Sequence, residues 1–543
     1  MGELAKDLIS RLNRLSSART VWESHWQELA ERFRPHRADF TAQQTAGAKR
    51  TEDSFDSTPL LAVRGLATAI DFILKPKTSN WLSLRAADKE LNEDDAVKGW
   101  LERSERQIWT AIYSPGAKFI ERTNEVDNDL VTFGTGLLFI GEKIGEGELL
   151  FRSLRLANTY IAENAKGDID TVFRTFKYTA RQAVQAFGRK VLGEKVLEAL
   201  NDDQPDKEFR FLHAVFPRRE REPGHLDNRN MPFASFVVEI ASEHVIEESG
   251  FHEFPYAVPR WDTSTEEVYG RSPGMLALPD AKTLNRMGRT MLRTGEKIAD
   301  PPLLAPDDGV IGPPRLFPGG ITYYDATLFR RGGGVPIQPL QTGANLPITL
   351  EMQERTRDQI WTAFFRNVLQ LPVPGKQMTA TEILERRQEF LRVIGPTFIR
   401  LETGYIAPIA ERVFNILLRG GVFDEPPERL RGRRVKFEYA SVVQKAQKQI
   451  DVAAAAATID ILAPFATVDP TIMDHFDGDR IAPGVAAAQG FPTDWMRPID
   501  RVQAIREARQ QAAAAEAAKA DAERLAEGVS KLSRAQAPGP PGQ

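Results

Sequence analysis

A chain of 543 residues, of which 42% are hydrophobic and 27% charged, is longer than one hydrophobic core usually supports, so we expect several lobes. Its formal net charge of −4 argues against tight binding to phosphate backbones along the whole chain, and the lack of cysteine excludes disulfides, thiolate metal ligands and a cysteine nucleophile. Residues 1–10 contain three charged residues, and no apolar run reaches about eighteen residues, so we expect neither a secretion signal nor a membrane anchor.

Amphipathic helices are expected at the start of the chain. Apolar residues from Leu8 to Phe33 recur at spacings of three, four and seven, which predicts helix as far as Pro35. Residues 58–74 predict another helix, with Pro59 in its first turn. Residues 100–113 and 119–133 also follow a helical pattern.

From Leu137 the pattern changes to short runs of β-branched and aromatic residues. These runs cover residues 137–140, 149–154, 171–178, 209–216 and 233–240. They predict a mostly antiparallel sheet, interrupted by a helical pattern over residues 182–200.

Residues 275–299 predict a helix with two contrasting faces, bounded by Pro273 and by the prolines at 301 and 302. One face carries the apolar residues Leu284, Met287, Met291 and Ile298. The opposite face carries a basic stripe, which consists of Lys282, Arg286, Arg289, Arg293 and Lys297.

Residues 301–347 are dense in proline and glycine, which predicts loops and short strands. Helix returns over residues 350–365, which carry an acidic stripe of Glu351, Glu354 and Asp358. After a loop at 371–377, a long helical pattern covers 379–418, with kinks expected at Gly395-Pro396 and again at Pro408. A strand over 435–439, alanine-rich helices from Val443 and a disordered tail over 537–543 complete an α+β, predominantly α, fold.

Most motifs of enzymes and of metal or cofactor sites are missing. The sequence has no phosphate-binding loop of the G-x-x-x-x-G-K-[ST] type, and Gly134-Thr135-Gly136 lacks the third glycine of a dinucleotide site, so a turn is the better interpretation. The seven histidines show no ligand spacing, and the aspartates at 474, 477 and 479 lack the pattern of a calcium loop. We therefore expect no cofactor and no metal.

One match to a catalytic motif requires an argument. Gly270-Arg271-Ser272-Pro273-Gly274 satisfies the G-x-S-x-G pattern of a serine hydrolase, with Ser272 as the nucleophile. In such a site the residue after the serine donates its backbone N–H to the oxyanion, and Pro273 has none. A turn that starts the following helix is the favoured interpretation, and a hydrolase acting through Ser272 is retained as an alternative.

The order of these parts resembles the portal proteins, the head-to-tail connecting proteins of short-tailed, T7-like phages. Four separated blocks carry the resemblance and span roughly residues 20–420. They are Leu74-Lys75-Pro76 with Trp81-Leu82-Ser83-Leu84, then Phe133-Gly134-Thr135-Gly136, then Tyr269 to Gly274 with Leu284-Asn285, and finally Met378 to Glu382 with Gly395-Pro396 and Pro408-Ile409.

The resemblance implies a portal fold that assembles as a ring, typically of twelve copies. It divides the chain into a wing with a helical N-terminus and a sheet (1–270), a first stem helix (271–300), a clip (301–347), a second stem helix (348–370), a channel loop (371–378), a long kinked wing helix (379–422), a helical crown (423–535) and a tail (536–543). The channel loop residues would be Leu371, Val373, Lys376 and Gln377.

The implied partners are further copies of the chain, the major capsid and scaffolding proteins, the terminase large subunit, tail adaptor proteins and double-stranded DNA that passes without sequence specificity. The implied location is the head-tail vertex of the virion, after assembly in the bacterial cytoplasm. An internal scaffold or minor head protein is the remaining alternative.

The basic stripe permits two interpretations. Its five cations could contact DNA phosphates, but such contacts from every subunit would oppose the sliding of DNA through a portal. We favour ion pairs between the basic stripe of one subunit and the acidic stripe of a neighbour, which could fix their register.

Overall fold

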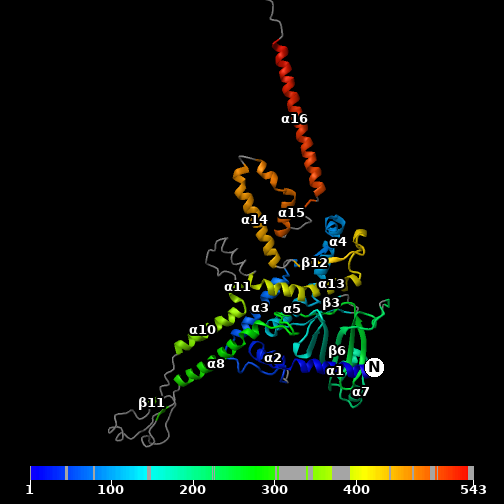
Figure 1. Cartoon of the computed structure of the whole chain (residues 1–543), viewed down its shortest axis with the longest axis vertical. Helices are drawn as coiled ribbons and strands as arrows, with labels where there is room; N and C mark the ends of the chain where they lie inside the picture. Colours follow the sequence, from blue (N-terminus) through cyan, green and yellow to red (C-terminus); the bar gives the residue numbers. More distant parts are fainter. Residues whose placement is uncertain are drawn as a thin grey trace, which may run out of the picture. The chain divides into compact units, whose positions relative to one another are not determined.

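The structure is a computed structural model of the chain. It describes residues 2–42, 47–77, 80–143, 148–222, 224–225, 227–299, 303–304, 338–339, 346–369, 392–439, 442–466, 470–489, 496–497 and 499–535. The chain divides into unit 1, Met1–Ser441, and unit 2, Val442–Gln543. Figure 1 shows helices and sheets in unit 1 and helices in unit 2.

Helices begin unit 1, as the spacing of apolar residues predicts. The first amphipathic segment forms two helices, α1 (Gly2–Ala18) and α2 (Thr20–Phe33), because the chain leaves helical geometry at Arg19. Helix α3 (Thr58–Leu74) has the predicted bounds, and its proline lies in the first turn. Helix α4 (Asp95–Ile112) begins earlier than expected because Asp94 caps it, and α5 (Phe119–Phe133) again has the predicted bounds.

A five-stranded antiparallel sheet has the order β4-β5-β6-β7-β8. Its strands are β4 (Thr159–Glu163), β5 (Ile169–Thr179), β6 (Glu208–Pro217), β7 (Phe233–Glu239) and β8 (His244–Phe251). Helix α1 covers one face through Ala5, Leu8 and Leu12. Helices α6 (Ala180–Phe187) and α7 (Glu194–Asn201) cover the other, so the alternating strands bury both faces.

Two smaller sheets join distant parts of unit 1. One has the order β3-β2-β9, from β2 (Leu138–Lys143), β3 (Glu148–Ser153) and β9 (Tyr256–Ala257). In the other, β1 (Leu82–Ala86) pairs antiparallel with β12 (Val435–Tyr439). This pairing fixes the end of unit 1 to a strand near its start.

Two helices lie side by side and extend from the rest of unit 1 in Figure 1: α8 (Pro273–Ala299) and α10 (Leu346–Ala363). A short helix, α11 (Arg366–Leu369), follows α10. The chain is again described from residue 392, where helix continues through Gly395-Pro396 to residue 401. A π-helical turn, Glu402–Ile406, then leads into α13 (Ala407–Arg419), so an irregular turn lies just before Pro408.

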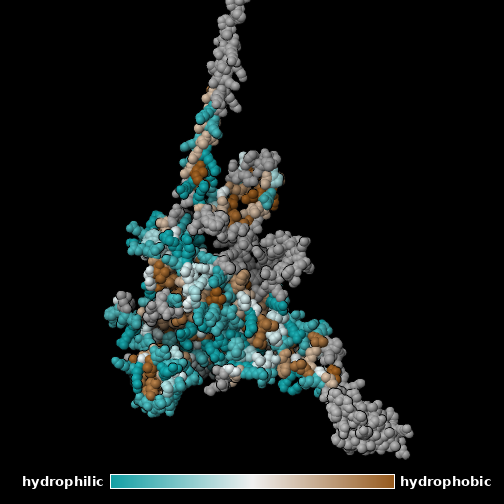
Figure 2. All heavy atoms as spheres, turned by 180° about the vertical axis from the view of Figure 1, so that it is seen from behind, coloured by the Kyte–Doolittle hydropathy of each residue, from teal (hydrophilic) through white to brown (hydrophobic). Residues whose placement is uncertain are grey.

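Unit 2 contains α14 (Val442–Ala466), α15 (Gly478–Gln489) and α16 (Ile499–Ala535). These helices agree with the alanine-rich helical pattern from Val443. The tail over 537–543 lies outside the described residues. The view in Figure 2 shows hydrophobic patches scattered over a mostly hydrophilic surface of unit 1, and one such patch belongs to the segment that carries α8 and α10.

Candidate functional site: the paired helices and their junction

The paired helices α8 and α10 are embedded at one end only. In α8 the buried residues run from Pro273 to Leu284, and the following turns have no fully buried residue. Met287 and Met291 of the predicted apolar face are partly buried, whereas Ile298 is half exposed. The apolar face therefore packs against the protein in its first half and opens to solvent toward residue 299.

The basic stripe lies on the exposed side of α8. Lys282 forms an ion pair with Glu28 of α2, and the Arg289 guanidinium lies 6.0 Å from the centre of the Phe55 ring. Arg286, Arg293 and Lys297 are exposed and form no ion pair with any residue that the structure describes.

The acidic stripe lies on exposed positions of α10. Glu351 accepts from Arg355 on its own helix at 2.8 Å, while Glu354 and Asp358 form no ion pair within the described ranges. No described ion pair links the acidic stripe to the basic stripe within one chain. Both stripes therefore keep charges available for a partner.

A short segment before α3 holds the two helices together. Asn285 of α8 accepts from the Phe55 backbone N–H at 2.8 Å. Arg357 of α10 donates to Asp56 at 2.9 and 3.0 Å. Burial alone would raise the pKa of Asp56, but the hydrogen bonds from Thr58 and Arg357 outweigh it and lower that pKa. The segment thus bonds to one residue of each helix.

The start of α8 packs against the end of α5 at a glycine junction, which comprises residues 132–136 and 270–274. Gly134 has φ +82°, which favours glycine, and a Cβ at Gly134 or Gly270 would collide with the carbonyl oxygen of the other. The Gly270 N–H donates to the Thr135 hydroxyl at 2.9 Å. Two of the blocks that carry the portal resemblance are therefore in direct contact.

Ser272 belongs to this junction. Its hydroxyl donates to the Thr132 carbonyl at 2.7 Å and accepts from the Met275 N–H at 3.0 Å, and the residue is 6% exposed. Both contacts are with backbone groups. Ser272 therefore caps α8, and no residue in the described part of the chain acts on its hydroxyl as the activating base that a nucleophile needs.

Two predicted elements lie mostly or wholly outside the described residues. The channel loop residues Leu371, Val373, Lys376 and Gln377 all lie outside the described residues. Of the predicted clip, the structure describes only β10 (Leu303–Leu304) and β11 (Gln338–Pro339), which pair antiparallel. The two ends of the segment therefore meet.

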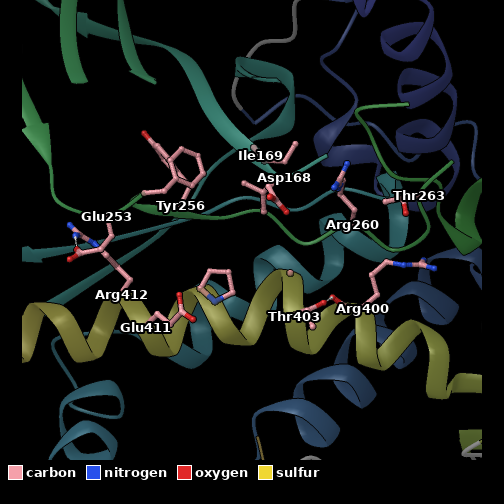
Figure 3. Close-up of a pocket in the computed structure, with 14 residues that line it drawn as sticks. Asp168, Ile169, Glu253, Tyr256, Arg260, Thr263, Arg400, Thr403, Glu411 and Arg412 are labelled. Atoms are coloured by element: carbon pink, nitrogen blue, oxygen red, sulfur yellow. Dashed lines mark hydrogen bonds and ion pairs between the residues drawn. The ribbon is translucent and has the colours of Figure 1, made fainter. Parts of the chain in front are cut away.

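A cleft of about 460 Å³ lies between the sheets and the helical segment around Pro408. Figure 3 shows Glu411, Thr403 and Arg400 rising from that helix toward the strand that carries Tyr256. The lining charges are three arginines, Arg260, Arg400 and Arg412, and three acids, Asp168, Glu253 and Glu411. Within the described chain, no group of three metal-ligating side chains occurs there or elsewhere.

The arginines of the cleft already have partners. Arg260 pairs with Glu163, and Arg400 donates to Asp262 at 2.8 Å. Arg412 pairs with Glu253, which also accepts from Arg419 at 2.6 Å. Asp168 and Glu411 are therefore the cleft acids without a cation among the described residues.

A match to one family profile identifies the family of this chain. The profile described as "Bacteriophage head to tail connecting protein" matches residues 5–496. The chain belongs to this head-to-tail connector family. The matched range contains the paired helices, the glycine junction and the cleft. The finer grouping with T7-like phages stays a prediction.

Two curated relatives align with the connector along nearly its whole length. The "Portal protein" of Salmonella phage epsilon15 is 29% identical over 99% of this chain and 97% of its own. The "Probable portal protein" of Bordetella phage BPP-1 is 28% identical over 94% of this chain and 93% of its own.

Among solved structures, the connector is similar to a chain from "Virion of native gene transfer agent (GTA) particle", with 11% identity and a TM-score of 0.34 over 80% of this chain and 94% of that one. It is also similar to a chain from "Neck of native GTA particle computed with C12 symmetry", with 11% identity and a TM-score of 0.33 over 76% and 92%.

The structure also shows a buried arginine that periodicity did not single out. Arg19, at the break between α1 and α2, is 1% exposed. It donates to the carbonyls of Leu156, Ala157 and Thr159 at 2.9, 2.7 and 2.6 Å, and its guanidinium lies 3.8 Å from the centre of the Tyr160 ring. Only the position of one cation between two amphipathic segments could have indicated this role.

A buried ion pair joins three helical segments of the connector. Lys75, at the end of α3, donates to Asp127 of α5 at 2.6 Å, and neither side chain is exposed. The Lys75 ammonium also lies 4.7 Å from the ring centre of Tyr405 in the π-helical turn. Burial raises the pKa of Asp127 to about 6, although the Lys75 ammonium opposes this rise. Lys75 lies in a block that carries the resemblance, but no sequence pattern indicates its partner.

Proposed function

We propose that this chain is the portal protein of a bacteriophage, a ring at one vertex of the head through which DNA is packaged and ejected. The observation that carries the proposal is the connector-family match over residues 5–496. The two relatives that align with 99% and 94% of the chain and are named as portal proteins support it. Head-to-tail packing around a rotation axis lets identical subunits close such a ring, for which we propose twelve copies.

The parts of the portal follow from the portal resemblance. Residues 1–270 and 379–422 form the wing, 271–300 and 348–370 form the stem and contain most of α8 and α10, 301–347 form the clip, 371–378 form the channel loop, and 423–535 form the crown. Pairing between β10 and β11 supports the clip, because an excursion whose ends meet can protrude as one element. The clip would dock terminase and then the tail adaptors.

The stem stripes would pair between neighbouring subunits. Exposed charges on α8 and α10 without partners in their own chain support this role. DNA would pass through the ring without sequence-specific contacts. The remaining partners are capsid and scaffolding proteins, and assembly takes place in the host cytoplasm.

The alternatives have less support. The connector family is a structural one by its description, and Ser272 caps a helix through backbone contacts. An internal scaffold or minor head protein is not expected to match the connector family over residues 5–496, as this chain does.

The test is DNA packaging into heads assembled from the same phage's capsid, scaffolding and terminase proteins. Heads assembled with this chain should package DNA, and heads assembled without it should stay empty. A chain lacking residues 305–337 should form rings but fail to package. Packaging by heads that lack the chain entirely would overturn the proposal.

A further inference from the structure

The cleft of about 460 Å³ contains acidic groups that its own chain leaves without cations. Glu411 makes no ion pair with a described residue, and Asp168 receives only a hydrogen bond from Asn164 at 3.4 Å. Partial burial raises the pKa of the Glu411 carboxyl. The three arginines of the cleft are bonded elsewhere. An incoming cation would therefore find two free carboxylates.

The rim of the cleft adds an apolar contact. Ile399 lies one helical turn before Thr403, which lines the cleft, and it is 58% exposed. Glu411 follows Ile399 by twelve residues, or roughly 18 Å along a helix. This helical segment therefore presents an apolar residue and a carboxylate along its exposed side.

Helix α3 presents the complementary arrangement. Leu61, Gly65, Thr68 and Phe72 lie within about 60° of one another around the helix at 100° per residue. Leu61 is 51% exposed, Phe72 is 69% exposed, and a Cβ at Gly65 would meet open space. The face is apolar and has no partner among the described residues of its own chain.

One cation borders this face of α3. Arg64 is exposed and forms no ion pair within the described chain. It lies eight residues before Phe72, or roughly 12 Å along the helix. The outer face of α3 thus combines a free cation with exposed apolar side chains.

We propose that the outer face of α3 docks on the cleft of a second copy of this chain, with Arg64 directed to Glu411 and Asp168 and Phe72 toward Ile399. This inference rests on the proposed ring, because head-to-tail closure needs two different faces that complement each other. Charge complementarity selects the pair, because a helix face with one free cation meets a cleft that has two carboxylates without a described cation and an apolar residue at its rim. The contact lies on the body of unit 1 and is additional to the stem stripes.

The experiment is a charge swap read by negative-stain electron microscopy and sedimentation velocity of the full chain. Arg64→Glu and Glu411→Arg should each lower the fraction of chains in rings by roughly tenfold, because each places like charges together at every interface. The double variant Arg64→Glu/Glu411→Arg should restore rings. Arg181→Glu, at an exposed position of α6 with no described ion pair, is the matched control and should leave rings unchanged.

The outcomes separate this contact from the ring itself. Both altered residues are exposed, so the melting temperature of each variant should match that of the unaltered chain. Normal rings from both single variants, or a double variant that fails to recover, would overturn the contact and leave the portal proposal standing. An unaltered chain that forms no rings would overturn both.

Discussion

Reversing two charges of the basic stripe tests how the stem holds its neighbours. Arg289 and Arg293 are exposed, and neither forms an ion pair within the described chain. Each exposed pair contributes about 0–1 kcal/mol. Arg289→Glu/Arg293→Glu would remove two attractions and introduce two repulsions, or about 2 kcal/mol per interface. That change lowers the association constant about thirtyfold at each interface.

The double variant should stay folded, since the only described contact that it loses is the Arg289 contact with Phe55. Rings should become rarer in sedimentation velocity and negative stain, more so at about 50 mM than at 500 mM salt, because salt screens the like charges. Arg181→Glu/Lys190→Glu, at exposed positions, is the matched control. Normal rings at low salt that fail only in packaging or ejection would refute the inter-subunit role and favour contact with DNA.

Three further predictions concern the fold of unit 1. Ser272→Ala should lower the free energy of unfolding by about 1–2 kcal/mol in denaturant titration, because α8 loses its cap. If the unaltered chain has esterase activity and this change abolishes it, the hydrolase interpretation is restored. Lys75→Met should cost about 3–5 kcal/mol, since it leaves the Asp127 charge buried alone, and adding Asp127→Asn should recover part of that loss; equal stability of all three proteins would contradict this account. Burial raises the pKa of Glu105 to about 7 from the usual 4.5, so its contribution to stability is complete below pH 4.5 and is lost as the pH rises through 7. Glu105→Gln should therefore flatten the dependence of the melting temperature on pH between 4.5 and 8, and an unchanged slope would contradict the assignment.

Apolar spacing and helix-end residues predict those elements whose bounds depend on neighbouring residues in the sequence. Helices α3 and α5 have the predicted bounds because apolar spacing marks both, an early proline marks the start of α3, and a following glycine marks the end of α5. The sequence patterns do not predict strands β1, β4, β8 and β9. Strand β8 carries glutamates at 247 and 248 and lies at the sheet edge, where alternation is weak. Hydrogen bonds to β7 hold this segment as a strand, although its composition does not predict one.

Long-range contacts could not be predicted from the sequence. The β1–β12 pairing, the contact between Arg19 and the loop before β4, and the Lys75–Asp127 pair each join segments far apart in the chain. The glycine junction shows the same limit. Gly134 and Gly270 each indicated a turn, but only the fold shows that each glycine leaves room for the other.

The stripes were predicted from helical periodicity, and the structure places their charges on exposed positions. Lys282 differs from the other residues of the basic stripe because it forms an ion pair with Glu28 of α2 in the same chain. That pairing reflects the packing of α2 against α8, which periodicity on either helix alone does not reveal.

The most direct test of the portal assignment is a negative-stain image of the purified full-length protein. We expect rings of one size with a central hole wide enough for a DNA duplex and a rotational symmetry of about twelve. Particles that are uniformly monomeric, or closed assemblies without a central hole, would contradict it.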